Sequence, residues 1–306
     1  MRESEASIRG RVMRDLIAHV TNDHLIGKKI KNGELRKKMV EPPWKCPDMF
    51  TMTTIEMEHF TMEWLELKEN PNEQKVILQL HGGGYIGAMR NAYRMFAGLY
   101  CEVSHGMSVL TPDYRVAPEH PYPAALEDAY AAYCYLLEQG WFSEQIIIAG
   151  DSAGGGLAMA LCHYLKDHGK QLPCGIVAMS PWTDLAASGE SYETNFERDP
   201  LFGKTRDSLI YNKDYIGDND PYNPYISPLY GDFRGFPPML IQVGSYEMLL
   251  SDSVDVAAKA REQGVKVRIS IYEGMFHIFQ MAAKMLPESK RAWVEIGKFI
   301  DVLLND

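Results

Sequence analysis

The 306-residue sequence lacks three features that would place it in a specialised class of proteins. It has no run of about 18 apolar residues, so we expect no membrane-spanning helix. Its first thirty residues are charged rather than apolar, so we expect no secretory signal and predict a cytoplasmic location. Cysteine is scarce, and the five cysteines form no CxxC pair and no zinc-ligand spacing, so we expect free thiols and no metal site.

Basic residues are also fewer than acidic ones. Lys and Arg total 31 against 41 Asp and Glu, which gives a formal net charge of −10. A field of this sign does not attract nucleic acid or anionic lipid. We therefore expect no nucleic-acid partner and no stable membrane association, and a small molecule, neutral or cationic, as the partner.

Residues 1–45 differ in character from the rest of the chain. They carry eleven basic and six acidic residues, a net charge of +5, which leaves −15 for the remainder. Within this segment Ile8, Val12, Leu16, Ile17 and Val20 recur at helical spacing, which predicts an amphipathic helix. Because the apolar stripe is narrow and lacks Trp, we expect the helix to pack on its own protein rather than lie on a membrane.

Strand-like and helical segments alternate through most of the remaining chain. We expect strands at 53–58, 61–67, 76–80, 109–110, 146–149, 176–179, 239–243 and 267–271, and helices at 123–137, 155–165, 254–263 and 291–304. Short apolar strands separated by helices indicate an α/β fold with a mostly parallel sheet covered on both faces. The stretch 182–230 interrupts this alternation and is typical of an inserted segment.

The strongest motif is Gly150-Asp151-Ser152-Ala153-Gly154-Gly155, which follows an expected strand and opens an expected helix. This is a G-x-S-x-G nucleophile elbow in its required context. The turn holds the serine in a strained conformation, and glycines beside it avoid collisions with the adjoining strand and helix. Ser152 is therefore the candidate nucleophile.

A second motif is His81-Gly82-Gly83-Gly84, directly after the strand at 76–80. Backbone N–H groups approach a developing oxyanion closely only where side chains are absent, so the run predicts an oxyanion hole. Gly82, Gly84 and Gly87 also fit the G-x-G-x-x-G of a dinucleotide loop. That alternative leaves the serine elbow unexplained, and its acidic residue, Glu102, falls within a further predicted helix rather than at a strand end, so we expect no nucleotide cofactor.

The candidate base is His277. In hydrolases with this elbow the acid and then the histidine follow the serine along the chain. His163 and His168 also follow Ser152, but they lie about 11 and 16 residues along the helix that begins there and are carried away from it at about 1.5 Å per residue. His277 lies in the loop after the last expected strand.

The candidate acid is Glu247, the first carboxylate after the strand at 239–243 and 30 residues before His277. Asp252 is the competing candidate. It falls at the expected start of the next helix, where an aspartate more often caps the helix N-terminus. We therefore favour Glu247 as the acid.

Three motifs resemble those of the hormone-sensitive-lipase-like carboxylesterases of the α/β-hydrolase superfamily. They are the serine elbow at 150–155, the glycine run at 81–84 and the segment Asp113-Tyr114-Arg115-Val116-Ala117-Pro118-Glu119. The resemblance covers residues 75 to 305. It implies an α/β-hydrolase catalytic domain over 46–306 and a helical cap formed by 1–45 and an insertion at about 182–230. The bacterial branch of the family implies short to medium acyl chains, and its members are often dimers, so a homodimer is possible.

One position departs from the family pattern. The acid loop of the family usually holds aspartate where this chain has Glu247, and Asp252 matches a second, non-catalytic aspartate of the family. Glutamate is accepted in such triads. Its extra methylene requires the loop to sit back by about 1.5 Å or the side chain to fold. We expect the segment 113–119 to brace the loops near the oxyanion hole.

The sequence therefore predicts a serine carboxylesterase that works through an acyl-enzyme intermediate and needs no cofactor. The backbone N–H groups of Gly83, Gly84 and Ala153 are the expected oxyanion donors. Two alternatives stay open at this point. The same triad serves an amidase or deacetylase, and a catalytically silent small-molecule-binding homologue could keep the fold.

Overall fold

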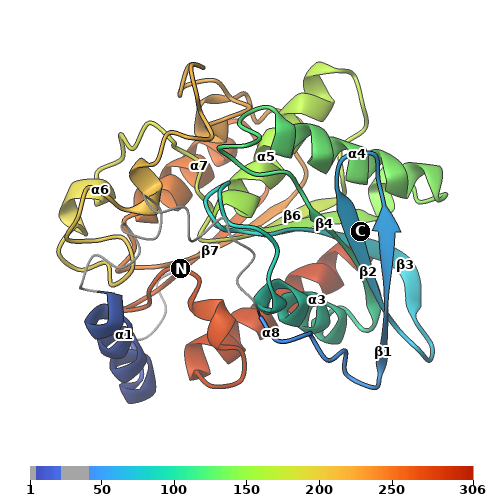
Figure 1. Ribbon diagram of the computed structural model, residues 1–306, viewed down its shortest axis with the longest axis horizontal. Helices are drawn as coiled ribbons and strands as arrows, with labels where there is room; N and C mark the ends of the chain where they lie inside the picture. The colour runs from blue at the N-terminus through green and yellow to red at the C-terminus, as the bar shows by residue number, and fades with distance from the viewer. Residues whose placement is uncertain (1–4, 22–40, 306) are drawn as a thin grey trace.

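An eight-stranded sheet forms the centre of the computed structural model, which describes residues 5–21 and 41–305 (Figure 1). The strand order is β1-β2-β4-β3-β5-β6-β7-β8, with antiparallel pairing of β1 with β2 and of β2 with β4 and parallel pairing elsewhere. The strands are β1 Phe50–Glu56, β2 Thr61–Leu67, β3 Asn72–Leu80, β4 Met107–Asp113, β5 Ile146–Asp151, β6 Gly175–Met179, β7 Met239–Gly244 and β8 Val267–Tyr272. The expected mostly parallel α/β sheet is confirmed.

Helices cover both faces of the sheet, as Figure 1 shows. Alternate residues of β3 point to opposite faces: Val76 and Leu78 join the core under α4, α5 and α7, and Ile77 joins the core under α3 and α8. The helices are α1 Ile8–Thr21, α3 Asn91–Val103, α4 Ala124–Glu138, α5 Ala153–Asp167, α6 Ser191–Thr194, α7 Leu250–Glu262 and α8 Pro287–Asn305. Among the described residues, no helix is both long and apolar enough to cross a membrane.

The stretch 182–230 adds no strand to the sheet. It contains α6 and two short 3₁₀ turns, Leu209–Tyr211 and Pro228–Tyr230. Its large aromatic side chains include Trp182, Tyr192 and Tyr215, which are buried in the core on the α4, α5 and α7 side. These side chains therefore anchor the insertion to the sheet and its helices.

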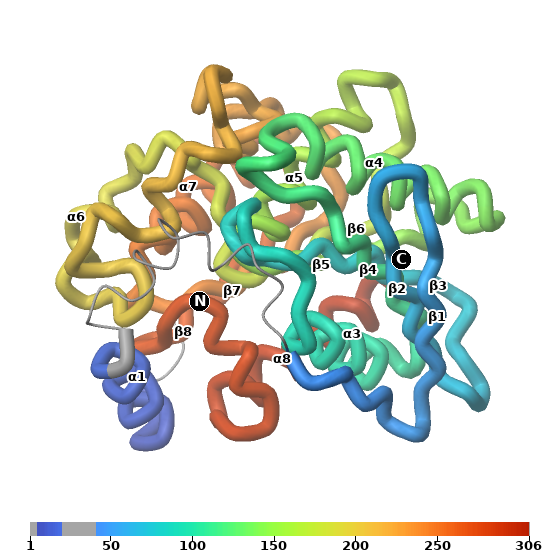
Figure 2. Tube along the Cα trace, viewed as in Figure 1, coloured from blue at the N-terminus to red at the C-terminus, as the bar shows by residue number. Residues whose placement is uncertain are grey.

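The helix expected near the N-terminus is present as α1, but most of its predicted docking face is wrong, since only Ile17 of the described stripe residues packs inward. Ile8, Val12 and Leu16 are exposed, while Met13 and Ile17 pack against the chain that follows β8. Figure 2 shows α1 at one edge of the molecule, beside that chain. The side chain of Val20 and residues 22–40 lie outside the described part.

The reason for this orientation is a close approach at Gly10. A Cβ at Gly10 would lie 2.6 Å from the Met275 Cε atom and 3.3 Å from the Glu288 carboxylate. The Glu288 carboxylate accepts hydrogen bonds from the Ser7 N–H at 2.6 Å and from the Ser7 hydroxyl at 3.1 Å. Because Gly10 has no side chain, its face of α1 can approach Met275 and Glu288 closely. The face that carries Ile8, Val12 and Leu16 has larger side chains and could not come as close.

The turn between β5 and α5 packs against the end of β3 at van der Waals limits. A Cβ at Gly154 would lie 2.0 Å from the Leu80 carbonyl oxygen, and a Cβ at Gly150 would lie 2.3 Å from the Gly154 carbonyl oxygen. Because β3 and β5 are paired neighbours, this contact brings the loop after Leu80 beside the turn at Ser152. Glycine at both positions is what permits this contact.

We predict that Gly154→Ala lowers the free energy of unfolding by at least about 2 kcal/mol, because the added methyl group must displace backbone. Gly98→Ala in α3 is the matched control, since its Cβ would lie 3.6 Å from the Phe50 ring, an ordinary contact. The control should be neutral or slightly stabilising. Urea denaturation of both variants gives the comparison, and equal stabilities would show that the contact at Leu80 does not constrain the fold.

Candidate active site

Ser152 occupies the single position between the end of β5 and the start of α5. Its backbone has φ +52° and ψ −120°, a conformation that L residues rarely adopt and that costs on the order of 1–3 kcal/mol. The Ser152 N–H donates a hydrogen bond to the Met179 carbonyl at 2.9 Å. Gly150 and Gly154, on either side of Ser152, leave room for the tight turn. The strain expected for a nucleophile elbow is therefore present.

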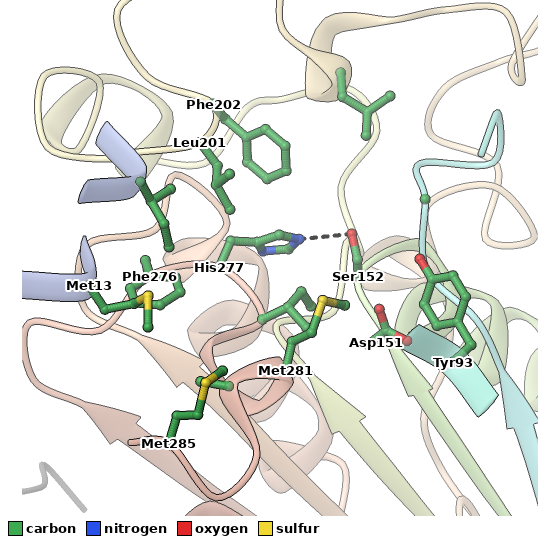
Figure 3. A pocket seen from close by; sticks show the side chains of 15 residues that line it. Met13, Tyr93, Asp151, Ser152, Leu201, Phe202, Phe276, His277, Met281 and Met285 are labelled. Carbon is green, nitrogen blue, oxygen red and sulfur yellow. Dashed lines mark hydrogen bonds between the residues drawn. The ribbon is translucent and has the colours of Figure 1, made fainter. Parts of the chain in front are cut away.

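Ser152, His277 and Glu247, which the sequence predicts to form a triad, lie together. Figure 3 shows Ser152 and His277. Ser152 Oγ is 3.0 Å from His277 Nε2, and His277 Nδ1 is 2.8 Å from Glu247 Oε2. Ser152 and His277 are 5% and 6% exposed, and Glu247 is fully buried. With Nδ1 protonated, Nε2 is free to accept the serine proton.

Glu247 is held by more than His277. Its Oε1 atom accepts a hydrogen bond from the Ser180 hydroxyl at 2.7 Å and another from the Gly244 N–H. The second bond shows that the side chain folds back over its own loop, which accommodates the extra methylene. Asn195 Nδ2 donates to the Glu247 carbonyl at 2.7 Å and fixes the loop itself.

Ser180 is a positioning residue that sequence reasoning missed. It follows β6 directly, with φ +46°, and its hydroxyl oxygen also accepts the Ile278 N–H at 3.3 Å. The available signal was its place at the carboxyl end of a strand that lies between β5 and β7 in the sheet. A lone serine at a strand end carries no pattern that distinguishes it from other loop serines.

The structure places the competing residues elsewhere. Asp252 is buried in the first turn of α7, and its Oδ1 accepts the N–H groups of Thr183 at 2.8 Å and Asp184 at 2.9 Å. The expected helix-capping role was therefore wrong, since Asp252 holds a distant loop instead. His163 Nε2 lies 3.1 Å from the Pro228 carbonyl, and the His168 ring stacks on Tyr164.

The glycine loop after β3 presents unpaired backbone donors. No described residue accepts a hydrogen bond from the N–H of Gly83, Gly84 or Ala153. Gly83 and Gly84 have φ of +110° and +63°, which glycine adopts without strain. Gly82 donates its N–H to Asp151 Oδ1 at 3.1 Å, which ties the loop to the residue before Ser152.

The segment 113–119 braces this loop as expected. The Tyr114 hydroxyl donates to the His81 carbonyl at 2.6 Å, and the two rings stack at 4.1 Å. Asp113 Oδ1 accepts the Met89 N–H at 3.2 Å, and Ala117 donates its N–H to the Tyr85 carbonyl at 2.7 Å. These bonds fix the loop at three points along its length.

A cavity of about 420 Å³ opens onto Ser152 and His277. Its walls are almost entirely apolar and come from segments far apart in the sequence. They include Met13 and Ile17 from α1, Leu201, Phe202 and Leu209 from the insertion, and Phe276, Met281 and Met285 from the chain after β8 (Figure 3). An apolar chamber with a few polar groups at one end suits a ligand with an apolar body and one reactive polar group.

A second cavity, of about 280 Å³, adjoins the first. The two share Gly83, Tyr93, Leu209 and Met281, and the second adds the charged residues Glu41 and Arg90. The glycine loop at Gly83 therefore borders both the apolar chamber and a more polar one.

Burial raises the pKa of the Asp151 carboxyl to about 7, with the nearby His277 acting in the opposite direction. The unfolded chain releases this proton near pH 3.9. Between these two values the folded protein holds a proton that the unfolded chain has lost, so the contribution of Asp151 to stability falls as pH rises. Burial lowers the pKa of His163 to about 4. The contribution of His163 to stability therefore rises with pH over this range.

We predict that the stability of wild type relative to Asp151→Asn decreases from about pH 4 to about pH 7. The variant keeps the acceptor for the Gly82 N–H but cannot titrate, and the contribution of His163 cancels in the difference. Urea denaturation of both proteins across this range measures the effect. A difference that stays constant or rises with pH would contradict the raised pKa.

Comparison with known proteins gives the family. A family described as having the alpha/beta hydrolase fold matches residues 77–281. An acetyl-hydrolase from Streptomyces hygroscopicus is 39% identical over 80% of this chain and 81% of its own. An esterase from Acinetobacter venetianus is 38% identical over 76% of this chain and 77% of its own.

Solved structures agree with this assignment. The crystal structure of EstE5 soaked with ethyl alcohol superimposes with a TM-score of 0.85 at 32% identity, covering 98% of this chain and 100% of that one. An esterase from the bacterial hormone-sensitive lipase family gives a TM-score of 0.84 at 32% identity, with the same coverage. Fold, motifs and relatives agree, and the chain belongs to the bacterial hormone-sensitive-lipase branch of the α/β-hydrolase family.

Proposed function

We propose that the protein is a serine carboxylesterase that hydrolyses carboxylic esters with short to medium acyl chains. The observation that carries this proposal is the hydrogen-bonded series Ser152–His277–Glu247 at the end of an apolar cavity. The relatives named esterase and acetyl-hydrolase support the same reaction class. The cytoplasmic location and a homodimeric state stay predictions from the sequence and the resemblance.

The first half of the reaction forms an acyl-enzyme. Ser152 Oγ attacks the ester carbonyl carbon while His277 Nε2 takes the hydroxyl proton. Glu247 stabilises the imidazolium that results and keeps the ring oriented. The tetrahedral intermediate collapses when His277 gives that proton to the departing alcohol oxygen. Water then attacks the acyl-enzyme by the same route and releases the acid.

The N–H groups of Gly83, Gly84 and Ala153 would receive the negative charge on the carbonyl oxygen. No acceptor for these N–H groups lies among the described residues, which supports this role, because a preorganised donor costs no rearrangement when charge develops. Ala153 also begins α5, whose N-terminal dipole favours negative charge. No metal or organic cofactor enters these steps.

The cavity volume supports the preference for shorter acyl chains. At about 420 Å³ it lies near the lower end of ligand pockets, which span about 300–1,000 Å³. We place the acyl group in this chamber and the alcohol group in the smaller cavity beside Arg90 and Glu41. Segments 1–45 and 182–230 act as the cap over a catalytic domain of 46–306, since described residues of both segments line the chamber.

We predict that Ser152→Ala lowers kcat by about 10⁴ to 10⁶ without loss of fold. Initial rates on p-nitrophenyl acetate, butyrate, octanoate and palmitate give the measurement, with activity falling steeply towards palmitate. Ser253→Ala is the matched control, because Ser253 is a buried serine whose hydroxyl has no described partner. A folded wild-type protein active on p-nitroacetanilide but on none of the esters would indicate an amidase with the same triad. Inactivity on both substrate types would overturn the proposal.

We also predict that Glu247→Gln lowers kcat/KM by about 10³ to 10⁴, because an amide cannot stabilise the imidazolium. Asp252→Asn keeps the Oδ1 acceptor for its two N–H partners and should cost less than about tenfold in rate. Thermal unfolding of both variants separates a loss of stability from a loss of catalysis. If Asp252→Asn proved the more damaging to the rate, the acid would have to be reassigned.

A further inference from the structure

Tyr93 stands at the boundary between the two cavities, in the first turn of α3. It lines both of them, together with Gly83, Leu209 and Met281. Its side chain is only 8% exposed, and Figure 3 shows its hydroxyl directed towards the space in front of Ser152. Of the described residues that border both cavities, Tyr93 is the one with a polar side chain.

The Tyr93 ring is held in place by its surroundings. Its centre lies 5.0 Å from the centre of the His81 ring, and the two planes are inclined by 35°. The Tyr93 carbonyl accepts a hydrogen bond from Gln79 Nε2 at 2.9 Å, so this turn of α3 is tied to the end of β3. The hydroxyl is therefore presented to the cavities from a fixed direction.

The Tyr93 hydroxyl has no hydrogen-bond partner among the described residues. Burial raises the pKa of this hydroxyl, Asp151 raises it further, and Arg90 and Glu41 act on it in opposite directions. The group therefore stays protonated at neutral pH and can donate a hydrogen bond. A buried donor without an acceptor in the protein is a place for an acceptor on a ligand.

The position of Tyr93 favours the alcohol half of an ester. Ser152 lines the larger cavity and Gly83 lines both, so an ester group held between these two residues reaches the junction of the cavities. Beyond its catalytic end the larger cavity has apolar walls, whereas Glu41 and Arg90 border the second one. An oxygen atom a few bonds beyond the ester link, on the alcohol side, therefore meets a donor in surroundings that are partly polar.

We propose that the Tyr93 hydroxyl donates a hydrogen bond to an oxygen atom in the alcohol half of the substrate. Tyr93 then determines specificity, and the preferred substrates are short-chain esters of alcohols that carry a second oxygen, such as alkoxy alcohols or diols. An ester without this oxygen leaves the hydroxyl unpaired and is disfavoured. This inference rests on the proposed function, because it assigns one half of an ester to each cavity.

Two acetate esters of equal length test this inference. 2-Methoxyethyl acetate has one oxygen where butyl acetate has a methylene group, and both carry the same acyl group. Titration of the released acetic acid gives kcat/KM for each ester. We expect the ratio of kcat/KM on 2-methoxyethyl acetate to that on butyl acetate to be about 3- to 10-fold lower in Tyr93→Phe than in wild type. The intrinsic reactivities of the two esters cancel in this comparison.

Tyr100→Phe is the matched control. Tyr100 lies on the same helix, is buried against Trp293 and also has a hydroxyl without a described partner. It is not among the described residues that line either cavity. This variant should keep the rates and the ratio of the wild type, and thermal unfolding shows whether both variants are folded.

Three results would overturn the inference. An active wild type whose ratio is unchanged in Tyr93→Phe would do so, and an equal loss on both esters would then assign the hydroxyl to the ester group that they share. The same fall of the ratio in Tyr100→Phe would show that the effect does not come from the cavities. Both of these results leave the proposed function intact, whereas a folded wild type inactive on both esters would contradict that function as well.

Discussion

The close approach of Gly154 to the Leu80 carbonyl is the contact on which the candidate active site depends. β3 and β5 are parallel neighbours, so the loops that follow them leave the same edge of the sheet. Without side chains at Gly150 and Gly154, α5 can begin directly beside the end of β3. Ser152 and Gly83 thereby come to line the same cavity.

Three further strand ends complete the arrangement around this contact. β6, β7 and β8 follow β5 in the sheet order and run parallel to it, and the loops after them supply Ser180, Glu247 and His277. The parallel register therefore brings together residues that are 30 to 125 positions apart in the chain. Glu247 is fully buried, and among the described residues its carboxylate is held by hydrogen bonds to Ser180, Gly244 and His277.

The features that the sequence predicted are those encoded in local backbone chemistry. Ser152, His277 and Glu247 each follow a strand whose apolar residues are visible in the sequence, and the glycine motifs mark positions where side chains cannot fit. The docking face of α1 could not be predicted, because it depends on how closely Met275 and Glu288 approach Gly10. The role of Asp252 was missed for a similar reason, since its backbone partners lie 68 and 69 residues away.

Some of the chamber walls come from α1 and the insertion, which supply none of Ser152, His277 and Glu247. Met13, Leu201 and Met285 shape the space that a substrate would fill, yet none of them bonds to Ser152, His277 or Glu247. Substitutions in the walls can therefore change which molecules fit while the chemistry beneath them stays intact. In evolution, the range of substrates could therefore change through single replacements in the cavity wall, while every intermediate keeps its catalytic residues.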